Sequence, residues 1–180
     1  ILQSMTRVVA DSSSLILLAK CSLLETVCDL FEVTIPSAVT AEVASENLVR
    51  GYTDAALISD LISREIIRVQ DPDRAISPLP ISLHQGEKQA LLLALNMKDA
   101  IFATDDGKAI RAARFLKVPF IITPKIVVEL FRLEKISFKK ARESLEKLGK
   151  IGRYSPDIIA GAIVSIMEEK NGKTDDYKDT

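Results

Sequence analysis

Short runs of β-branched and other apolar residues alternate with longer amphipathic runs along most of this chain. The short runs are predicted to be strands, and they cover residues 8–10, 33–35, 66–69, 101–104 and 120–122. Each is too short and too apolar for an exposed antiparallel ribbon, so we expect fully buried strands. The longer runs are then helices on both faces of the sheet. The alternation predicts an α/β fold, a three-layer α/β/α sandwich with a mostly parallel central sheet and a C-terminal helical extension.

The length and composition of the chain fit one domain of ordinary size. Its 180 residues are 47% hydrophobic, which is enough apolar material for one well-packed core. We expect a single domain over residues 5–170, with the core in 7–122 and the helical extension in 123–170. Met5 is a plausible natural start, so residues 1–4 are expected to be a remnant of processing or cloning. Residues 171–180 are predicted to be a polar, disordered tail.

Charge and cysteine content exclude several classes of protein. The formal net charge is -1, so the chain lacks the global basic character of many nucleic-acid-binding proteins. Cys21, Cys28 and the one histidine, His84, are too few for a structural zinc site. If their segment is helical, the two cysteines share one face, where buried reduced thiols are the ordinary expectation. No apolar run reaches the roughly 18 residues of a membrane span, and we expect a soluble, cytoplasmic protein.

One helix start is marked by its sequence. Ser82-Leu-His-Gln85 has the spacing of a capping box, so the helix that carries residues 90–95 is predicted to begin there. This start places Gly86 and Glu87 in the first turns of the helix. The preceding residues 71–80, with three prolines and two aspartates, are predicted to form an irregular loop.

Acidic side chains occur where a parallel sheet would gather them. Asp11 directly follows the first predicted strand, and Asp105 and Asp106 follow the fourth. Glu42 lies in the helix after the second strand, and Glu87 lies early in its own helix. Ligands of open parallel sheets bind beyond the carboxyl ends of the strands, so we expect these acids to converge on one pocket.

Such a cluster of carboxylates predicts a bound dication. Without a counter-ion the carboxylates would repel one another, and several would have to protonate or separate. Hard oxygen ligands without nearby Cys or His select Mg²⁺ or Mn²⁺. A site of this kind suits hydrolysis of a phosphodiester, with one ion or with two.

The order and spacing of these motifs resemble the PIN domain. The resemblance rests on Asp11-Ser12-Ser13, on the run from Pro36 to Glu42, on Gly86-Glu87 followed by Ala90, and on Thr104-Asp105-Asp106 before a basic helix. It covers roughly residues 7–122 and extends loosely to Tyr154-Ser-Pro-Asp-Ile-Ile-Ala-Gly161. The Gly-Glu third acid and the Asp-Asp doublet resemble a subgroup whose physiological role is poorly assigned.

The resemblance implies a metal-dependent ribonuclease that acts on single-stranded RNA. Small prokaryotic relatives are often VapC-type toxins with an antitoxin partner, and PIN domains of this size commonly form homodimers. The implied metal ligands and catalytic residues are Asp11, Glu42, Glu87 and either Asp105 or Asp106, with Ser13 and Thr104 in support. A Thr-x-Asp alignment selects Asp106 of the doublet, and an Asp-first alignment selects Asp105.

Basic residues are concentrated after the acidic doublet. Residues 107–153 contain thirteen Lys or Arg and four Asp or Glu. Lys108, Arg111 and Arg114 follow one another at intervals of three, so they share one side of a helix and either bind RNA phosphates or form a solvated face. The basic residues of 139–150 are interleaved with Glu143 and Glu146, which favours a solvated face. Because aromatic residues are 5% of the chain, we expect base stacking not to dominate RNA binding.

Each acid also has a structural interpretation, which leaves a second hypothesis. Asp11, Glu87 and the doublet are suited to capping helices, and Glu42 to a solvated helix surface. The alternative is therefore a catalytically inactive PIN-like module that binds RNA or a protein partner. A phosphotransfer enzyme of the haloacid-dehalogenase type is disfavoured because Ser13 stands where a second acid is expected.

Overall fold

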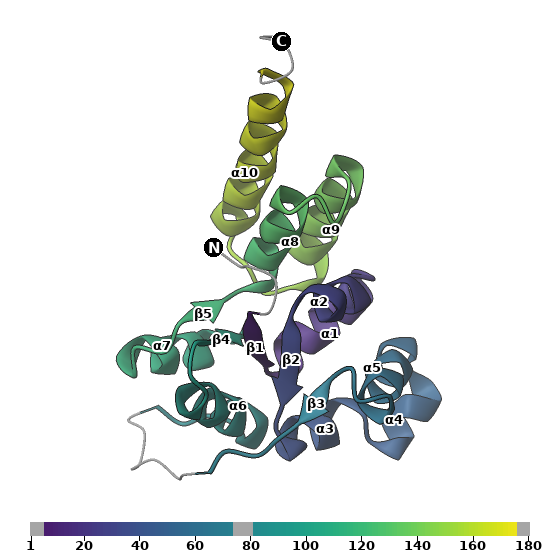
Figure 1. Cartoon of the computed structure of the whole chain (residues 1–180), viewed down its shortest axis with the longest axis vertical. Helices are drawn as coiled ribbons and strands as arrows, with labels where there is room; N and C mark the ends of the chain where they lie inside the picture. The colour runs from purple at the N-terminus through teal and green to yellow at the C-terminus, as the bar shows by residue number, and fades with distance from the viewer. Residues whose placement is uncertain (1–5, 74–80, 176–180) are drawn as a thin grey trace. The chain divides into compact units, whose positions relative to one another are not determined.

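The computed structural model describes residues 6–73 and 81–175 (Figure 1). The chain divides into two compact units, of which the first ends at Ile122 and the second begins at Thr123. The first unit contains a sheet covered by helices, and the second is helical. This arrangement confirms the predicted α/β class. Of the predicted irregular loop, residues 71–73 have no regular structure, and 74–80 lie outside the described residues.

All five predicted strands are present in one sheet, and every pairing is parallel. The strands are β1 (Arg7–Ala10), β2 (Glu32–Ile35), β3 (Arg68–Val69), β4 (Ala100–Ala103) and β5 (Phe120–Ile121). Their order across the sheet is β3-β2-β1-β4-β5. The central strand β1 is buried from Val8 to Ala10, as expected for a strand covered on both faces.

Helices lie on both sides of the sheet, as a right-handed winding of parallel strands requires. They are α1 (Ser12–Lys20), α2 (Leu24–Leu30), α3 (Ser37–Val43), α4 (Glu46–Gly51), α5 (Thr53–Ser63), α6 (Gln85–Asn96) and α7 (Gly107–Phe115). Figure 1 shows α1, α2, α4 and α5 on one side of the strands, with α6 and α7 on the other. The fold is the predicted three-layer sandwich.

The direction of winding reverses between β1 and β4. The chain runs from β1 outward to β2 and β3, and it then returns to the opposite side of β1 to form β4 and β5. Ala10 and Ala103, the last residues of β1 and β4, are paired in register. The residues that follow them are therefore neighbours at the reversal, which is where open parallel sheets leave a crevice for ligands.

One prediction about the first unit is wrong, and the condition of another is not met. The strand β3 is exposed, with Val69 at 46% of its accessible surface, because an edge strand has a neighbour on one side alone. The segment from Cys21 to Cys28 is not one helix, because Cys21 is the C-cap of α1 and Cys28 belongs to α2. Neither cysteine forms a disulfide, and burial, with smaller effects of Asp29 and Glu25, raises the pKa of Cys28 to about 12.

The second unit contains three helices that pack on one another. They are α8 (Thr123–Arg132), α9 (Phe138–Ile151) and α10 (Pro156–Asp175). Leu130, Leu145 and Ile166, one from each helix, are fully buried. Because α10 continues to Asp175, residues 171–175 of the predicted disordered tail are helical, and residues 176–180 lie outside the described residues. Among the helices described, none has both the length and the apolar character needed to cross a bilayer.

Candidate active site

Asp11 lies at the carboxyl end of β1 and is fully buried. It is the N-cap of α1, and its Oδ1 accepts hydrogen bonds from the backbone N–H of Ser14 at 3.1 Å and from the Ser13 hydroxyl at 2.6 Å. Its Oδ2 accepts a hydrogen bond from the hydroxyl of Thr104, which follows β4. The two oxygens are therefore held by donors from the two segments that follow β1 and β4.

Asp105 is joined to the same network. Its backbone N–H donates to Ser13 Oγ at 2.9 Å, so Ser13 connects the segment after β4 to Asp11. The charge of Asp105 is the smaller of the two effects that raise the pKa of Asp11. Asp11, Ser13, Thr104 and Asp105 thus form one cluster, although Thr104 and Asp11 are 93 residues apart in the sequence.

The environment of Asp11 disfavours its negative charge. The pKa of Asp11 is raised from 3.8 to about 6, and burial is the largest cause. Hydrogen bonds from Ser13, Thr104 and Ser14 lower the pKa and offset part of the effect of burial, while the charge of Asp105 adds to that effect. The folded chain therefore holds a buried carboxylate whose charge a nearby cation would stabilise.

The second aspartate of the doublet has a different role in the structure. Asp106 is the N-cap of α7, and its Oδ1 accepts hydrogen bonds from Lys108 N at 2.7 Å and Ala109 N at 2.9 Å. Its own N–H donates to Thr104 Oγ1 at 3.2 Å. The Asp106 side chain is thus committed to the start of α7.

Glu42 contacts the ends of two other helices. One carboxylate oxygen accepts a hydrogen bond from the Ser12 hydroxyl in α1, and the other accepts one from the Gly86 N–H in α6 at 2.9 Å. A β-carbon at Gly86 would lie 2.6 Å from Glu42 Cδ, closer than real contacts allow. Gly86 is therefore required for the Glu42 carboxylate to approach the N-terminus of α6, where the helix dipole favours a negative charge.

Glu87 caps its own helix. The helix α6 begins at Gln85, and Glu87 Oε2 accepts a hydrogen bond from the N–H of the N-cap residue His84 at 3.0 Å. The capping box is thus formed by His84 and Glu87, and the predicted box at Ser82 is wrong. The helix α6 therefore starts after the predicted position, and Gly86 and Glu87 lie in its first turn.

The structure brings the predicted acids to one edge of the sheet but does not arrange all of them around one point. Asp11 and Asp105 are coupled, whereas Glu42 and Glu87 are turned toward N–H groups at the start of α6. Within residues 6–73 and 81–175, no group of three acidic, His or Cys side chains is arranged to hold a metal ion. Two effects account for this separation. The carboxylates repel one another, and the N–H donors at the N-terminus of α6 attract Glu42 and Glu87.

The predicted basic residues line the exposed face of α7. Lys108, Arg111 and Arg114 are all exposed, while Ala109, Ala112 and Ala113 bury the opposite face. The Arg114 guanidinium lies over the Phe120 ring, 5.4 Å from its centroid. Because α7 begins directly after Asp106, these cations extend away from the acidic cluster along one helix.

Comparison with known proteins identifies the family. A family model described as a PIN domain matches residues 7–169. The chain belongs to the PIN-domain family. PIN domains are generally nucleases, which are hydrolases, and they commonly bind RNA. A search of curated proteins and a search of solved structures each found no significant match.

PIN nucleases generally use divalent metal ions, and the residues of this PIN domain fit such an ion on their chemistry. Asp11 and Asp105 offer hard oxygen ligands, and Mg²⁺ is often bound through one or two carboxylates and water. The raised pKa of the buried Asp11 marks a charge that a dication would compensate.

Two contacts of this PIN domain were not anticipated as part of its site. Ser12 and Gly86 hold Glu42, although they lie in helices far from it in the sequence. Ser12, Glu42 and Gly86 all belong to the motifs that resemble a PIN domain, and a glycine in the first turn of a helix indicates a close approach of some group. Neither signal shows that these residues contact one another.

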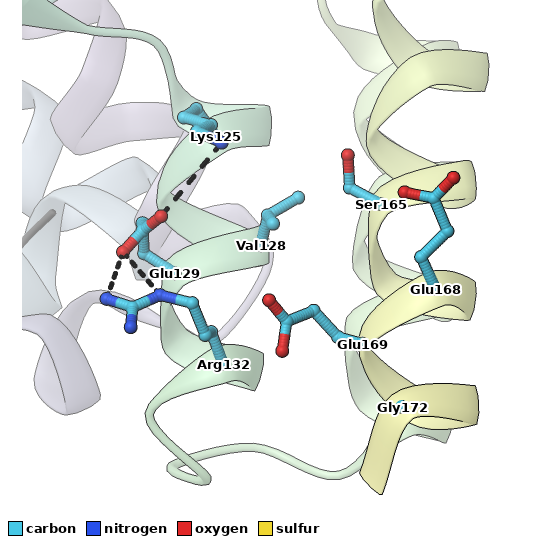
Figure 2. A pocket seen from close by; sticks show the side chains of 8 residues that line it. All are labelled: Lys125, Val128, Glu129, Arg132, Ser165, Glu168, Glu169 and Gly172. Carbon is cyan, nitrogen blue, oxygen red and sulfur yellow. Dashed lines mark hydrogen bonds and ion pairs between the residues drawn. The ribbon is translucent and has the colours of Figure 1, made fainter. Parts of the chain in front are cut away.

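The second unit of this PIN domain contains a groove of about 650 Å³ between α8 and α10 (Figure 2). On one wall, Glu129 accepts a hydrogen bond from Arg132 at 2.8 Å and lies 4.0 Å from Lys125. Glu168 and Glu169 project from the other wall. Glu129 is thus held in ion pairs with Arg132 and Lys125, and the groove is lined by side chains of both charges.

Proposed function

We propose that this PIN domain is a metal-dependent ribonuclease that hydrolyses phosphodiester bonds of single-stranded RNA. The observation that carries the proposal is the buried, hydrogen-bonded Asp11, which Ser13 links to the backbone of Asp105 at the reversal of the sheet. Placing a carboxylate in the interior is costly, and groups with perturbed pKa values in a crevice are typical of functional sites.

Asp11 and Asp105 are the proposed principal ligands of Mg²⁺ or Mn²⁺. When bound, such an ion supplies a polarised water for attack on phosphorus and positive charge for the leaving oxygen. Ser13 and Thr104 orient Asp11 through their hydroxyl groups. Glu42, held by Ser12 and Gly86, is the proposed third acid of the site.

The remaining two acids are assigned by their hydrogen bonds. Asp106 accepts from Lys108 N and Ala109 N, which supports a role in capping α7. Glu87 accepts from His84 N, which supports a role in fixing the start of α6 beside Glu42. In this proposal Asp105, rather than Asp106, is the ligand of the doublet.

The proposed substrate and partners follow from charge and from the family resemblance. Lys108 and Arg111 lie on the exposed face of a helix that begins at the acidic cluster, so they are placed to contact RNA phosphates. The resemblance to VapC-type proteins supports a toxin with an antitoxin partner, a homodimeric state and a location in the cytoplasm.

RNA binding without cleavage is the second candidate function. It is favoured by the observation that Glu42 and Glu87 point to backbone N–H groups, with no ready group of three acids in the described part of the chain. This candidate predicts RNA binding that is unchanged when metal is removed.

Cleavage of a labelled single-stranded RNA by wild type and by Asp11→Asn tests the proposal. With Mn²⁺ or Mg²⁺ we expect cleavage by wild type, none with EDTA, and none by Asp11→Asn, which retains a folded structure by circular dichroism. RNA that binds to wild type but stays intact under all metal conditions would instead support the second candidate.

A further inference from the structure

The exposed face of α7 presents an aromatic ring among cations. Phe115, the last residue of α7, is 64% exposed, which is unusual for a large apolar side chain beside a well-buried helix face. It follows Arg111 by four residues and Lys108 by seven, so the three side chains lie along one side of the helix. The buried face of the helix is fully provided by alanines, so packing of α7 does not require Phe115.

The charge of this face is not neutralised by neighbouring acids. The sequence of α7 contains no Asp or Glu, and no ion pair of Lys108 or Arg111 occurs among the described residues. In α9, by contrast, Lys139 lies 3.9 Å from Glu143, and Arg142 lies 2.9 Å from Glu146. The cations of α7 are thus free to meet an external polyanion.

The cations and the ring are ordered along the helix from the acidic cluster outward. Lys108 is in the first turn, and Arg111 points back over that turn, with Nη1 3.8 Å from the β-carbon position of Gly107. The rise of an α-helix places Phe115 about 10 Å farther along the axis than Lys108. Arg114 is held over Phe120 and borders the same face.

We propose that this face of α7 binds single-stranded RNA, with Lys108 and Arg111 on phosphates and an unpaired base stacked on Phe115. The inference rests on the proposed function and adds the residue, Phe115, through which the site would distinguish unpaired from paired RNA. Stacking on an aromatic side chain requires a base that is free of its own duplex, whereas phosphate contacts alone do not distinguish single from double strands.

Binding of a fluorescent RNA to the full chain, measured by anisotropy in EDTA, tests this inference without turnover. The variants are Phe115→Ala, Phe115→Leu, which keeps apolar bulk without a ring, and Phe115→Trp, which keeps a stacking surface. Tyr52→Ala removes another exposed aromatic residue, at 61%, and is the matched control. Each variant is compared on an unstructured single strand and on the same strand annealed to its complement.

We expect Phe115→Ala and Phe115→Leu to weaken single-strand binding by about 10-fold or more. Phe115→Trp and Tyr52→Ala should bind as wild type does, and duplex binding should be equal in all five proteins. Lys108→Ala should weaken binding to both RNAs and reduce the slope of log affinity against log salt by about 1.

Unchanged single-strand binding in Phe115→Ala, or wild-type affinity in Phe115→Leu, would overturn the inference, and so would a wild type that binds no RNA. Light scattering distinguishes a further outcome. If Phe115→Ala has a smaller mass than wild type and the same RNA affinity, Phe115 packs against another protein chain and not against a base. Failure of the proposed function has a different outcome, because RNA would then stay uncleaved with Mn²⁺ while the effects at Phe115 persist.

Discussion

Asp11 and Glu42 are both carboxylates at the carboxyl edge of the sheet, but they are held in different ways. Asp11 directly follows a buried strand, is itself buried, and shares hydrogen bonds with the segment after the neighbouring strand. Glu42 extends from a helix and reaches the N–H of Gly86 at the start of another. Side chains at strand ends are thus positioned by the sheet, whereas those on helices depend on how helices meet.

The largest effect should separate the two members of the acidic doublet. Asp105→Asn is expected to reduce RNA cleavage by at least about 1,000-fold, because it removes a proposed metal ligand coupled to Asp11. Asp106→Asn is the matched control and should keep most of the activity, since Asn caps helices as well as Asp does. Equal losses in both variants would contradict the assignment of Asp105, and the readout is single-turnover cleavage with Mn²⁺.

Asp11 should also reduce stability at neutral pH. In the folded protein the pKa of Asp11 is about 6, against 3.8 for an unperturbed group. Between these two pH values the folded chain binds the proton of Asp11 more tightly than the unfolded chain does. The free energy of unfolding therefore falls as pH rises from about 4 to about 6, by up to about 3 kcal/mol at neutral pH. Relative to wild type, Asp11→Asn should gain stability between about pH 4 and pH 7.

Urea unfolding in EDTA at several pH values measures this difference. A stability difference between Asp11→Asn and wild type that stays constant across the range would show that burial does not disfavour the Asp11 charge. In a parallel series without EDTA, added Mn²⁺ should raise the stability of wild type at neutral pH and leave Asp11→Asn unaffected.

A methyl group at Gly86 should test the helix-held side of the site. Because the β-carbon of Gly86→Ala would collide with the Glu42 carboxylate, Glu42 must move, and we expect a loss of Mn²⁺ affinity and of cleavage of about 10- to 100-fold. Gly51→Ala is the matched control, since no atom lies within 4 Å of its β-carbon position. Calorimetric Mn²⁺ affinity is the readout, and a Gly86→Ala protein that binds Mn²⁺ as wild type does would refute the positioning role.

The smallest effect is expected at Glu87. Glu87→Gln can still accept the hydrogen bond from His84 N, so cleavage and Mn²⁺ affinity should remain close to wild type. Glu87→Ala loses this capping contact and should unfold more easily, by about 1 kcal/mol, in thermal denaturation. A severe loss of Mn²⁺ binding in Glu87→Gln would instead make Glu87 a ligand.

The sequence predicts the acids of the candidate site but not the contacts that hold Glu42. Asp11 and the doublet Asp105-Asp106 are predicted to meet by the rule that parallel strands end at one edge, and this rule does not distinguish Asp105 from Asp106. The contact of Glu42 with Gly86 joins residues 44 apart and depends on the approach of α3 to α6, which no local pattern encodes. The exposure of Phe115 was also hidden, because an aromatic residue at a helix end is more often assigned to the core.

In the fold, too, local features are predicted from the sequence, and features that depend on long-range contacts are not. All five strands were predicted from apolar runs, but the exposure of β3 was missed, since strand order decides which strands lie at an edge. The start of α6 lies after the predicted one, because both Ser82-Gln85 and His84-Glu87 have the spacing of a capping box. The structure forms the second of these, in which Glu87 occupies the third helical position.

Calorimetric titration of Mn²⁺ into wild type and into Asp11→Asn tests the central claim most directly. We expect saturable binding to wild type and no detectable binding to Asp11→Asn, with Asp106→Asn binding as wild type does. Equal Mn²⁺ affinity in wild type and Asp11→Asn would contradict a dication site built on the buried carboxylate between β1 and β4.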